Sequence, residues 1–132
     1  DKDAEVFYPL SQAYAAKPET ELEKSEHEKL MEGLLYNAAI VPLEVMREAS
    51  HMMNSIDYLI KNGSKLAVSD AGVAVSLLRS AVCGAMMNVS INTKYMKDKN
   101  RAEELLKEAN EILSATMKQS DIIYKEVLEV LL

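Results

Sequence analysis

The stretch from Ser69 to Tyr95, SDAGVAVSLLRSAVCGAMMNVSINTKY, decides the fold. It contains no proline, and apolar side chains recur along it at helical spacing. One face of the expected helix carries Val75, Leu78, Val82, Met86 and Val89. A second face carries Ala74, Ala81, Gly84, Ala85 and Asn88. A helix without a clear polar face is buried in the middle of an assembly, so we expect other helices on every side of this one.

Two helices are predicted before this stretch. The first runs from Asp1 to about Ala16 and contains Pro9, which should bend it or move its start. The second is long: Thr20 can cap its start, and Pro42 should kink it. It should end at residues 62–63, Asn-Gly, where glycine supplies the left-handed conformation of a helix end.

One more helix is predicted after the stretch, starting at Asp98 or Asn100, and Ser69 is expected to cap the central helix. No segment shows a strand pattern. The predicted fold class is all-α, a bundle of long, partly kinked helices. Four helices carry more apolar surface than they can bury among themselves. We therefore expect a homodimer, or missing partner helices, or both.

Length and charge exclude several classes of protein. The chain has 132 residues, which fits one domain, and a formal net charge of −6, which argues against a nucleic-acid partner. No uninterrupted apolar run approaches the roughly 18 residues of a membrane span, so no membrane partner is expected. The first residues show neither a basic start nor an apolar signal core, so the expected location is cytoplasmic.

Asp3 is the first candidate for chemistry. It lies on one helical face with Phe7 and Leu10, and desolvation on an apolar face raises the pKa of a carboxylate. Such a group is useful for general acid–base work near neutral pH. The alternative is an ordinary acidic residue in a helix's first turn, which periodicity alone favours.

Asn88 and Asn92 form a second candidate pair, four residues apart on the central helix. A buried amide without a partner costs roughly 1–3 kcal/mol, so each should find one. The pair either bridges helices across a dimer contact or lines a polar pocket for a ligand.

The remaining candidates are weaker. Residues 69–72, Ser-Asp-Ala-Gly, begin a helix whose free N–H groups attract anions, although spacing alone favours ordinary capping. His27 and His51 are isolated, so no metal site is predicted, and His27 is expected on a solvated face. A local basic patch for a polyanionic substrate could form from Lys61, Lys65, Lys94, Lys97 and Lys99.

Four blocks together resemble one family. The opening Asp1-Lys2-Asp3-Ala4-Glu5-Val6-Phe7 resembles the D-x-D-A-x-A-F segment of the formiminotransferase-cyclodeaminases and the related bacterial methenyltetrahydrofolate cyclohydrolases. Val41-Pro42-Leu43 matches the family's V-P-L. Gly63 followed by Ser69-Asp70-Ala71-Gly72-Val73-Ala74 resembles its G-N-x-x-x-x-S-D-A-G-V-A-A stretch, and Asn88-Val89-Ser90-Ile91-Asn92 its N-V-x-I-N.

The resemblance implies a helical homodimer that converts 5-formiminotetrahydrofolate to 5,10-methenyltetrahydrofolate with release of ammonia. Related enzymes instead interconvert methenyl- and 10-formyltetrahydrofolate. Asp3 matches the family's acid–base residue, and Asp70, Gly72, Asn88 and Asn92 are carried over as substrate-binding candidates. The implied partner is a tetrahydrofolate derivative, with or without a polyglutamate tail, and no metal or further cofactor is needed.

The resemblance covers nearly the whole chain as one domain, 1–132, which lacks the family's N-terminal segment with its P-G-G-G-S glycine-rich turn. A non-catalytic helical dimerisation module or fragment is therefore the alternative to an enzyme.

Overall fold

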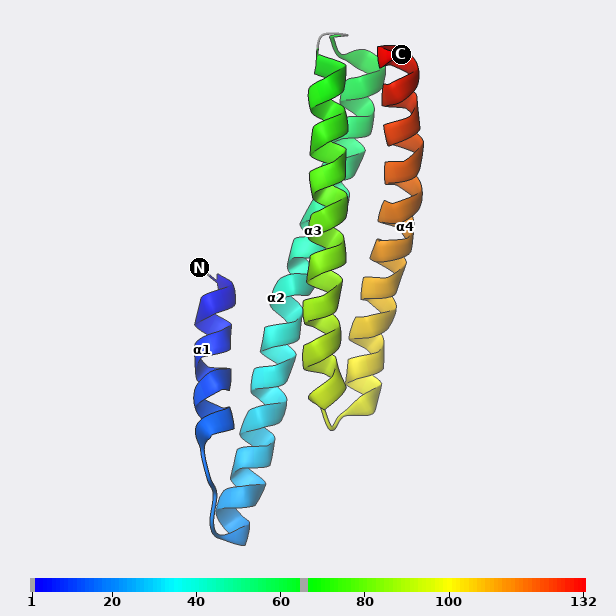
Figure 1. The fold of residues 1–132 in the computed structure, drawn as a ribbon. Coiled ribbons are helices and arrows are strands. Elements are labelled where there is room, and N and C mark those ends of the chain that lie inside the picture. The colour runs from blue at the N-terminus through cyan, green and yellow to red at the C-terminus, as the bar shows by residue number, and fades with distance from the viewer. Residues whose placement is uncertain (1, 65–66) are drawn as a thin grey trace.

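The computed structural model describes residues 2–64 and 67–132, which form helices α1 (Lys2–Ala15), α2 (Glu21–Asn62), α3 (Val68–Tyr95) and α4 (Lys99–Leu131). The described residues contain no strand. Helix α3 runs antiparallel to α2 and α4, which are parallel to each other, and the short α1 lies along the first half of α2 (Figure 1). The all-helical fold predicted from the sequence is confirmed.

Two helix starts follow the predicted chemistry. The Thr20 hydroxyl accepts a bond from the Glu23 amide at 3.2 Å, and the Glu23 carboxylate accepts one from the Thr20 amide at 3.0 Å. Bonds from the backbone amides of Thr20 and Glu19 lower the pKa of Glu23. Asp98 caps α4 by accepting from the Arg101 amide at 3.0 Å. Both caps supply acceptors for N–H groups that have no partner inside the helix.

Two predicted helix ends are wrong in detail. Helix α3 begins at Val68 after Ala67, which makes no side-chain cap, so Ser69 lies inside the helix and does not cap it. Gly63 has φ −94°, not the left-handed value. It is needed for close approach instead: its amide donates to the Leu59 carbonyl at 2.7 Å, and a Cβ at Gly63 would lie 2.4 Å from that oxygen.

Both predicted kink positions lie inside helices, Pro9 in α1 and Pro42 in α2. The assignment of α2 is continuous through Pro42. The bends themselves stay a prediction.

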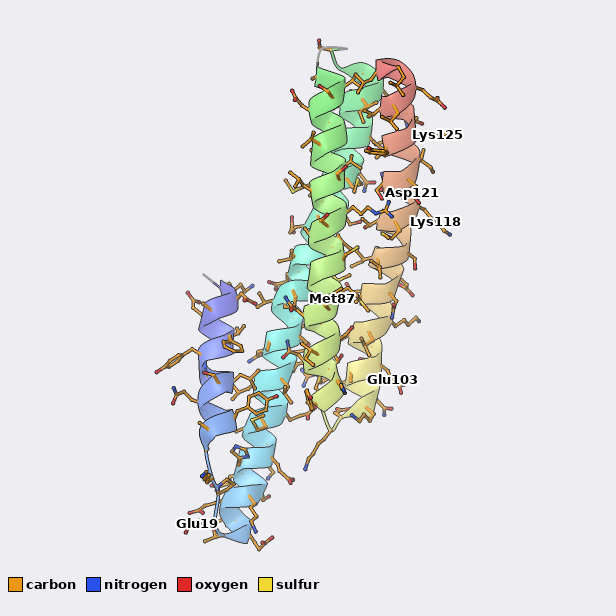
Figure 2. The ribbon with its side chains drawn as sticks, in the orientation of Figure 1. Glu19, Met87, Glu103, Lys118, Asp121 and Lys125 are labelled. Carbon is orange, nitrogen blue, oxygen red and sulfur yellow. The ribbon has the colours of Figure 1, made fainter. Side chains whose placement is uncertain are left out.

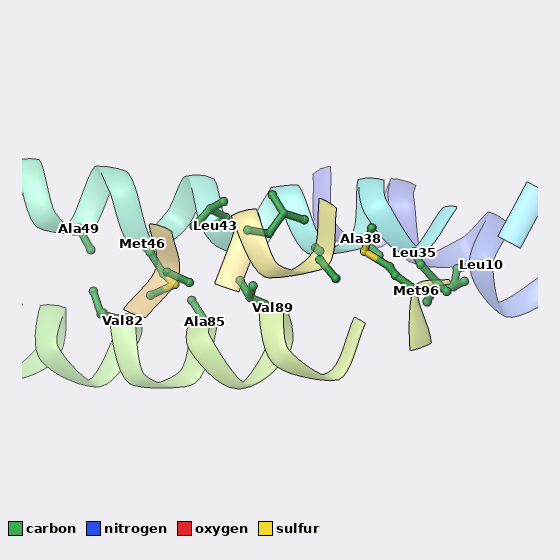
Figure 3. Packing of buried hydrophobic residues seen from close by; sticks show 14 residues of the cluster. Leu10, Leu35, Ala38, Leu43, Met46, Ala49, Val82, Ala85, Val89 and Met96 are labelled. Carbon is green, nitrogen blue, oxygen red and sulfur yellow. The ribbon is translucent and has the colours of Figure 1, made fainter. Parts of the chain in front are cut away.

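The core lies between α2, α3 and α4 (Figure 3). The predicted stripe of α3 supplies Val75, Val82 and Val89, each at most 1% exposed. Ala39 of α2 and Ala109 of α4 are fully buried, and such small side chains allow helices to pack closely. The stripe was therefore predicted correctly.

Helix α3 is not surrounded on every side within the single chain, and the expectation that a second subunit or further helices cover the rest of it stays a prediction. Val73, Leu77 and Met87 are 61%, 66% and 72% exposed (Met87 is labelled in Figure 2). No atom lies within 4 Å of a Cβ built on Gly84. Helices α2 and α4 cover only part of α3, so one apolar face of this helix has no neighbour in the described structure.

Helix α3 is also long and apolar enough to cross a membrane by length and composition, with 28% of its most apolar window buried. The core helices of soluble proteins also meet these two criteria of length and composition. Arg79 of α3 is paired with Asp121 of α4 (labelled in Figure 2) and donates to the Ser120 hydroxyl at 3.2 Å. We therefore treat α3 as the central helix of the bundle.

Candidate functional site

A cavity of about 340 Å³ lies where α1, α2 and α3 meet. It is lined by Asp3, Val6 and Phe7 of α1, Ala38 of α2, and Asn88, Ile91 and Asn92 of α3. The structure thus brings together three of the five predicted site residues, although Asp3 stands far from the two asparagines in sequence. Val6 and Ile91 stand inside the family blocks, but periodicity gave their side chains no functional signal, because these two residues and Ala38 resemble any core position.

Helix α1 positions Asp3 by its attachment to α2. Leu10 is 2% exposed against the core, and Lys2 is paired with Glu44 of α2 at 2.5 Å. At the other end of α1, the Ala13 carbonyl accepts a bond from Nε2 of His27 at 2.8 Å. His27 is therefore half-buried, and its predicted place on a solvated face is wrong.

Asp3, Phe7 and Leu10, which were predicted to share one helical face, differ in their exposure to solvent in the folded chain. Only Leu10 is buried, whereas Asp3 is exposed and Phe7 is 60% exposed. The apolar surroundings expected around the Asp3 carboxylate are therefore incomplete in a single chain. A bound ligand or a second subunit would have to complete them.

Asn92 joins two helices within one chain. Its Nδ2 donates to the Ala38 carbonyl of α2 at 3.1 Å and to the Asn88 carbonyl of α3 at 2.9 Å. The side chain of Asn88 is exposed at the same cavity. Asn92 therefore lines a cavity and also bridges α2 and α3 within one chain, whereas the alternative of a bridge across a dimer contact stays a prediction.

Asp70 and Gly72 lie elsewhere. Along α3, Gly72 is about 24 Å from Asn88 at a rise of roughly 1.5 Å per residue. A Cβ at Gly72 would lie 2.9 Å from Cγ1 of Val127, so this glycine lets α4 approach α3 closely. Asp70 is exposed and lines a different cavity near Gly63. In the single chain, neither residue contributes to the Asp3 cavity.

The predicted basic patch is divided between the two ends of α3. Lys61 lies at one end and is paired with Asp57 at 2.9 Å, and Lys65 lies outside the described residues. Three lysines remain together at the other end: Lys94, Lys97 and Lys99. Among them, Lys97 is paired with Glu28 at 2.7 Å, and this bond lowers the pKa of the Glu28 carboxyl.

Another cavity, of about 250 Å³, lies beside Lys97, and nothing in the sequence predicted it. Tyr14, His27, Tyr95 and Lys97 are among its lining residues. Within residues 2–64 and 67–132, no group of three or more His, Cys, Asp or Glu side chains is placed to hold a metal ion.

Comparison with known proteins gives three related findings. The family model described as formiminotransferase-cyclodeaminase matches residues 1–111. A methenyltetrahydrofolate cyclohydrolase of Methylorubrum extorquens is 30% identical over 95% of this chain and 60% of its own length. A formimidoyltransferase-cyclodeaminase of Gallus gallus is 25% identical over 93% of this chain, and one of Dictyostelium discoideum is 33% identical over 74%.

The chain is shorter than each of these relatives. It spans 60% of the cyclohydrolase, and 23% and 17% of the two formimidoyltransferase-cyclodeaminases. The similarity therefore concerns a part of each relative.

Proposed function

Because this chain belongs to the formiminotransferase-cyclodeaminase family, we propose that it is a folate one-carbon enzyme whose site is the cavity between α1, α2 and α3. One observation carries the proposal. Asp3 comes from the first of the four sequence blocks and Asn88 and Asn92 from the last, and all three line this single cavity. A carboxylate and two amides beside apolar side chains can hold and orient a flat heterocycle.

The first candidate reaction is the hydrolysis of 5,10-methenyltetrahydrofolate to 10-formyltetrahydrofolate. The cyclohydrolase relative supports it, because its similarity extends over nearly the whole chain. The reaction adds water to the methenyl carbon and then breaks the bond from that carbon to N5.

Asp3 would move the protons of this reaction. Its carboxylate takes one proton from water as the oxygen attacks the methenyl carbon, and it then gives that proton to N5 as the carbon–N5 bond breaks. The second proton of water goes to solvent when the formyl carbonyl forms. One carboxylate serves both transfers, and no cofactor beyond the folate takes part.

The second candidate is cyclodeamination of 5-formiminotetrahydrofolate, to which the sequence resemblance pointed first. N10 attacks the formimino carbon and loses its proton to Asp3, which passes it to the departing nitrogen. With one further proton from solvent, that nitrogen leaves as ammonia, and 5,10-methenyltetrahydrofolate remains. The similarity to two formimidoyltransferase-cyclodeaminases supports this candidate.

The working form we propose is a cytoplasmic homodimer joined through the uncovered face of α3. Val73, Leu77, Met87 and Ile91 are all at least 49% exposed on this one helix. Contiguous exposed apolar surface of this kind marks an interaction site in soluble proteins. Ile91 also lines the Asp3 cavity, so a partner packed on this face would enclose the site further.

The test is to assay the purified chain with both substrates. Hydrolysis of methenyltetrahydrofolate without release of ammonia from formiminotetrahydrofolate would support the first candidate, and the reverse result the second. A folded chain that binds no reduced folate and turns over neither substrate would contradict the proposal. Such a chain would be a helical interaction module.

A further inference from the structure

We propose that Pro42 and Asn92 together present a fixed hydrogen-bond acceptor, Oδ1 of Asn92, to the ring N–H groups of the pterin. This inference rests on the proposed function and names the part of the folate that the cavity recognises. Pro42 acts as a positioning residue, because it reaches the ligand only through Asn92.

Pro42 interrupts the backbone hydrogen bonding of α2. In an α-helix the amide of each residue donates to the carbonyl four residues earlier, so the partner of the Ala38 carbonyl would be residue 42. Residue 42 is proline, which has no N–H to donate. Pro42 therefore leaves the Ala38 carbonyl without its helical donor.

Asn92 supplies the missing donor from α3. Its Nδ2 lies 3.1 Å from the Ala38 carbonyl oxygen, and the same nitrogen lies 2.9 Å from the Asn88 carbonyl oxygen. A buried carbonyl without a partner costs free energy, so this bond stabilises the contact between α2 and α3. It also links residue 42 to the cavity, because Ala38 and Asn92 both line it.

These two bonds set the orientation of the Asn92 amide. An amide NH2 has two hydrogens, and both are directed at backbone carbonyls. The flipped amide would place Oδ1 against the same two carbonyl oxygens, which would repel it. The atom that Asn92 can offer to a ligand is therefore Oδ1, an acceptor.

An acceptor at this position selects the part of the folate that binds. The pterin ring carries an amino group and a ring N–H, both donors, and its flat face suits the neighbouring Phe7 and Ile91. The carboxylates of the glutamate tail are acceptors, so Oδ1 of Asn92 and the Asp3 carboxylate both disfavour them here. We place the pterin at Asn92 and the tail away from it.

The test measures the affinity of the full chain for 5-formyltetrahydrofolate, a stable reduced folate, and for p-aminobenzoylglutamate, which lacks the pterin. Asn92→Ala should weaken binding of the reduced folate about tenfold, the effect of one lost hydrogen bond of about 1.4 kcal/mol. Its affinity for p-aminobenzoylglutamate should stay unchanged. The matched control is Asn110→Ala, which removes a similar bond to the Leu106 carbonyl (2.8 Å) on α4 and should change neither affinity.

Pro42→Ala restores an N–H that competes with Asn92 for the Ala38 carbonyl. It should also weaken binding of the reduced folate, and the double variant should bind no more weakly than Asn92→Ala alone. The inference would be overturned if the double variant bound reduced folate more weakly than Asn92→Ala alone. It would also be overturned if the affinity of Asn92→Ala for reduced folate lay within twofold of that of the unaltered chain.

A second measurement does not depend on folate. The side-chain amide resonances of Asn92 should shift in Pro42→Ala and stay in place in Asn110→Ala. Unchanged Asn92 resonances in Pro42→Ala would overturn the positioning role. If the unaltered chain binds no reduced folate, the proposed function itself fails. If the unaltered chain binds reduced folate but the variants bind it equally well, only the inference about Pro42 and Asn92 fails.

Discussion

At the scale of single residues, the proposed reaction assigns proton transfer to Asp3, a role that the other described residues lining the cavity cannot take. Its neighbours there are apolar side chains and two amides, and amides neither gain nor lose protons near neutral pH. Proton transfer at this cavity therefore depends on one carboxylate. Gly72 contributes to the packing of the fold, because its lack of a side chain lets α4 approach α3.

Replacing Asp3 with Asn should lower turnover at least about a hundredfold, because an amide cannot move the proton. Helical content measured by circular dichroism should stay the same, because Asp3 is exposed on α1. Glu103→Gln makes the same chemical change at an exposed position of α4 and should retain full activity (Figure 2). Retained turnover in Asp3→Asn would remove Asp3 from the mechanism.

Replacing Gly72 with Ala should destabilise the fold by about 1 kcal/mol or more, because the new Cβ would lie 2.9 Å from the stiff side chain of Val127. Gly33→Ala is the matched control, since nothing lies within 4 Å of its Cβ. That change should instead stabilise helix α2 by about 0.5–1 kcal/mol. Urea unfolding measures the free energy of unfolding of both variants against that of the unaltered chain. Equal effects would show that Gly72 has no packing role.

Helical spacing made Asp3, Asn88 and Asn92 candidates, and the family resemblance then assigned them to a folate site. It could not reveal the link between Pro42 and Asn92, since that link depends on which carbonyl of α2 faces α3. It also grouped Asp70 and Gly72 with the site, because a motif shows that residues occur together and not where each one lies.

At the scale of helices, side-chain bonds join α2 to α4 beside the core. Arg47 of α2 donates from Nε and Nη2 to the two carboxylate oxygens of Glu108 of α4, at 2.6 and 2.8 Å. This pairing lowers the pKa of Glu108 and raises the pKa of Arg47. Two parallel bonds of this kind fix orientation as well as distance.

Replacing Glu108 with Gln should lower the free energy of unfolding at neutral pH by up to about 1 kcal/mol, a limit set by the partial exposure of the pair. A carboxyl whose pKa is lowered by folding stabilises the fold above its unfolded pKa, and loses that effect as the pH falls through its folded pKa. The difference between variant and unaltered chain should therefore begin to shrink as the pH falls below the ordinary glutamate value of 4.5, and should vanish below the lowered pKa of folded Glu108. Denaturation at several pH values checks this, with the exposed Glu111→Gln as control; a difference that persists in acid would contradict it.

The existence of the four helices could be predicted because the caps at Thr20 and Asp98 and the apolar stripe of α3 are local in sequence. Their details could not. Helix α3 starts at Val68 without a side-chain cap, and Gly63 is needed for its approach to Leu59, a contact that no spacing rule describes.

At the scale of the whole molecule, the uncovered face of α3 lies next to the candidate site. The sequence predicted neighbours on every side of this helix, some of them from a second subunit or further helices, and within the single chain α2 and α4 leave Met87 72% exposed. A sequence pattern shows that a face is apolar and does not show whether its partner belongs to the same chain.

Replacing Met87 with Lys should convert the proposed dimer to a monomer, because a charge in an apolar contact has no partner there. Light scattering at fixed concentration measures the mass, and circular dichroism checks that the helices remain. Ala115→Lys, on an exposed part of α4, should leave the mass unchanged. A monomeric unaltered chain, or a dimeric Met87→Lys variant, would exclude this face as the contact.

The central claim is that a reduced folate binds at Asp3, Asn88 and Asn92. The most direct measurement follows the side-chain amide resonances of the asparagines while 5-formyltetrahydrofolate is added to the full chain. Saturable shifts are expected at Asn88 and Asn92, with the resonances of Asn54 and Asn110 unchanged. Saturable shifts confined to other asparagines, or none at any concentration of folate, would contradict it.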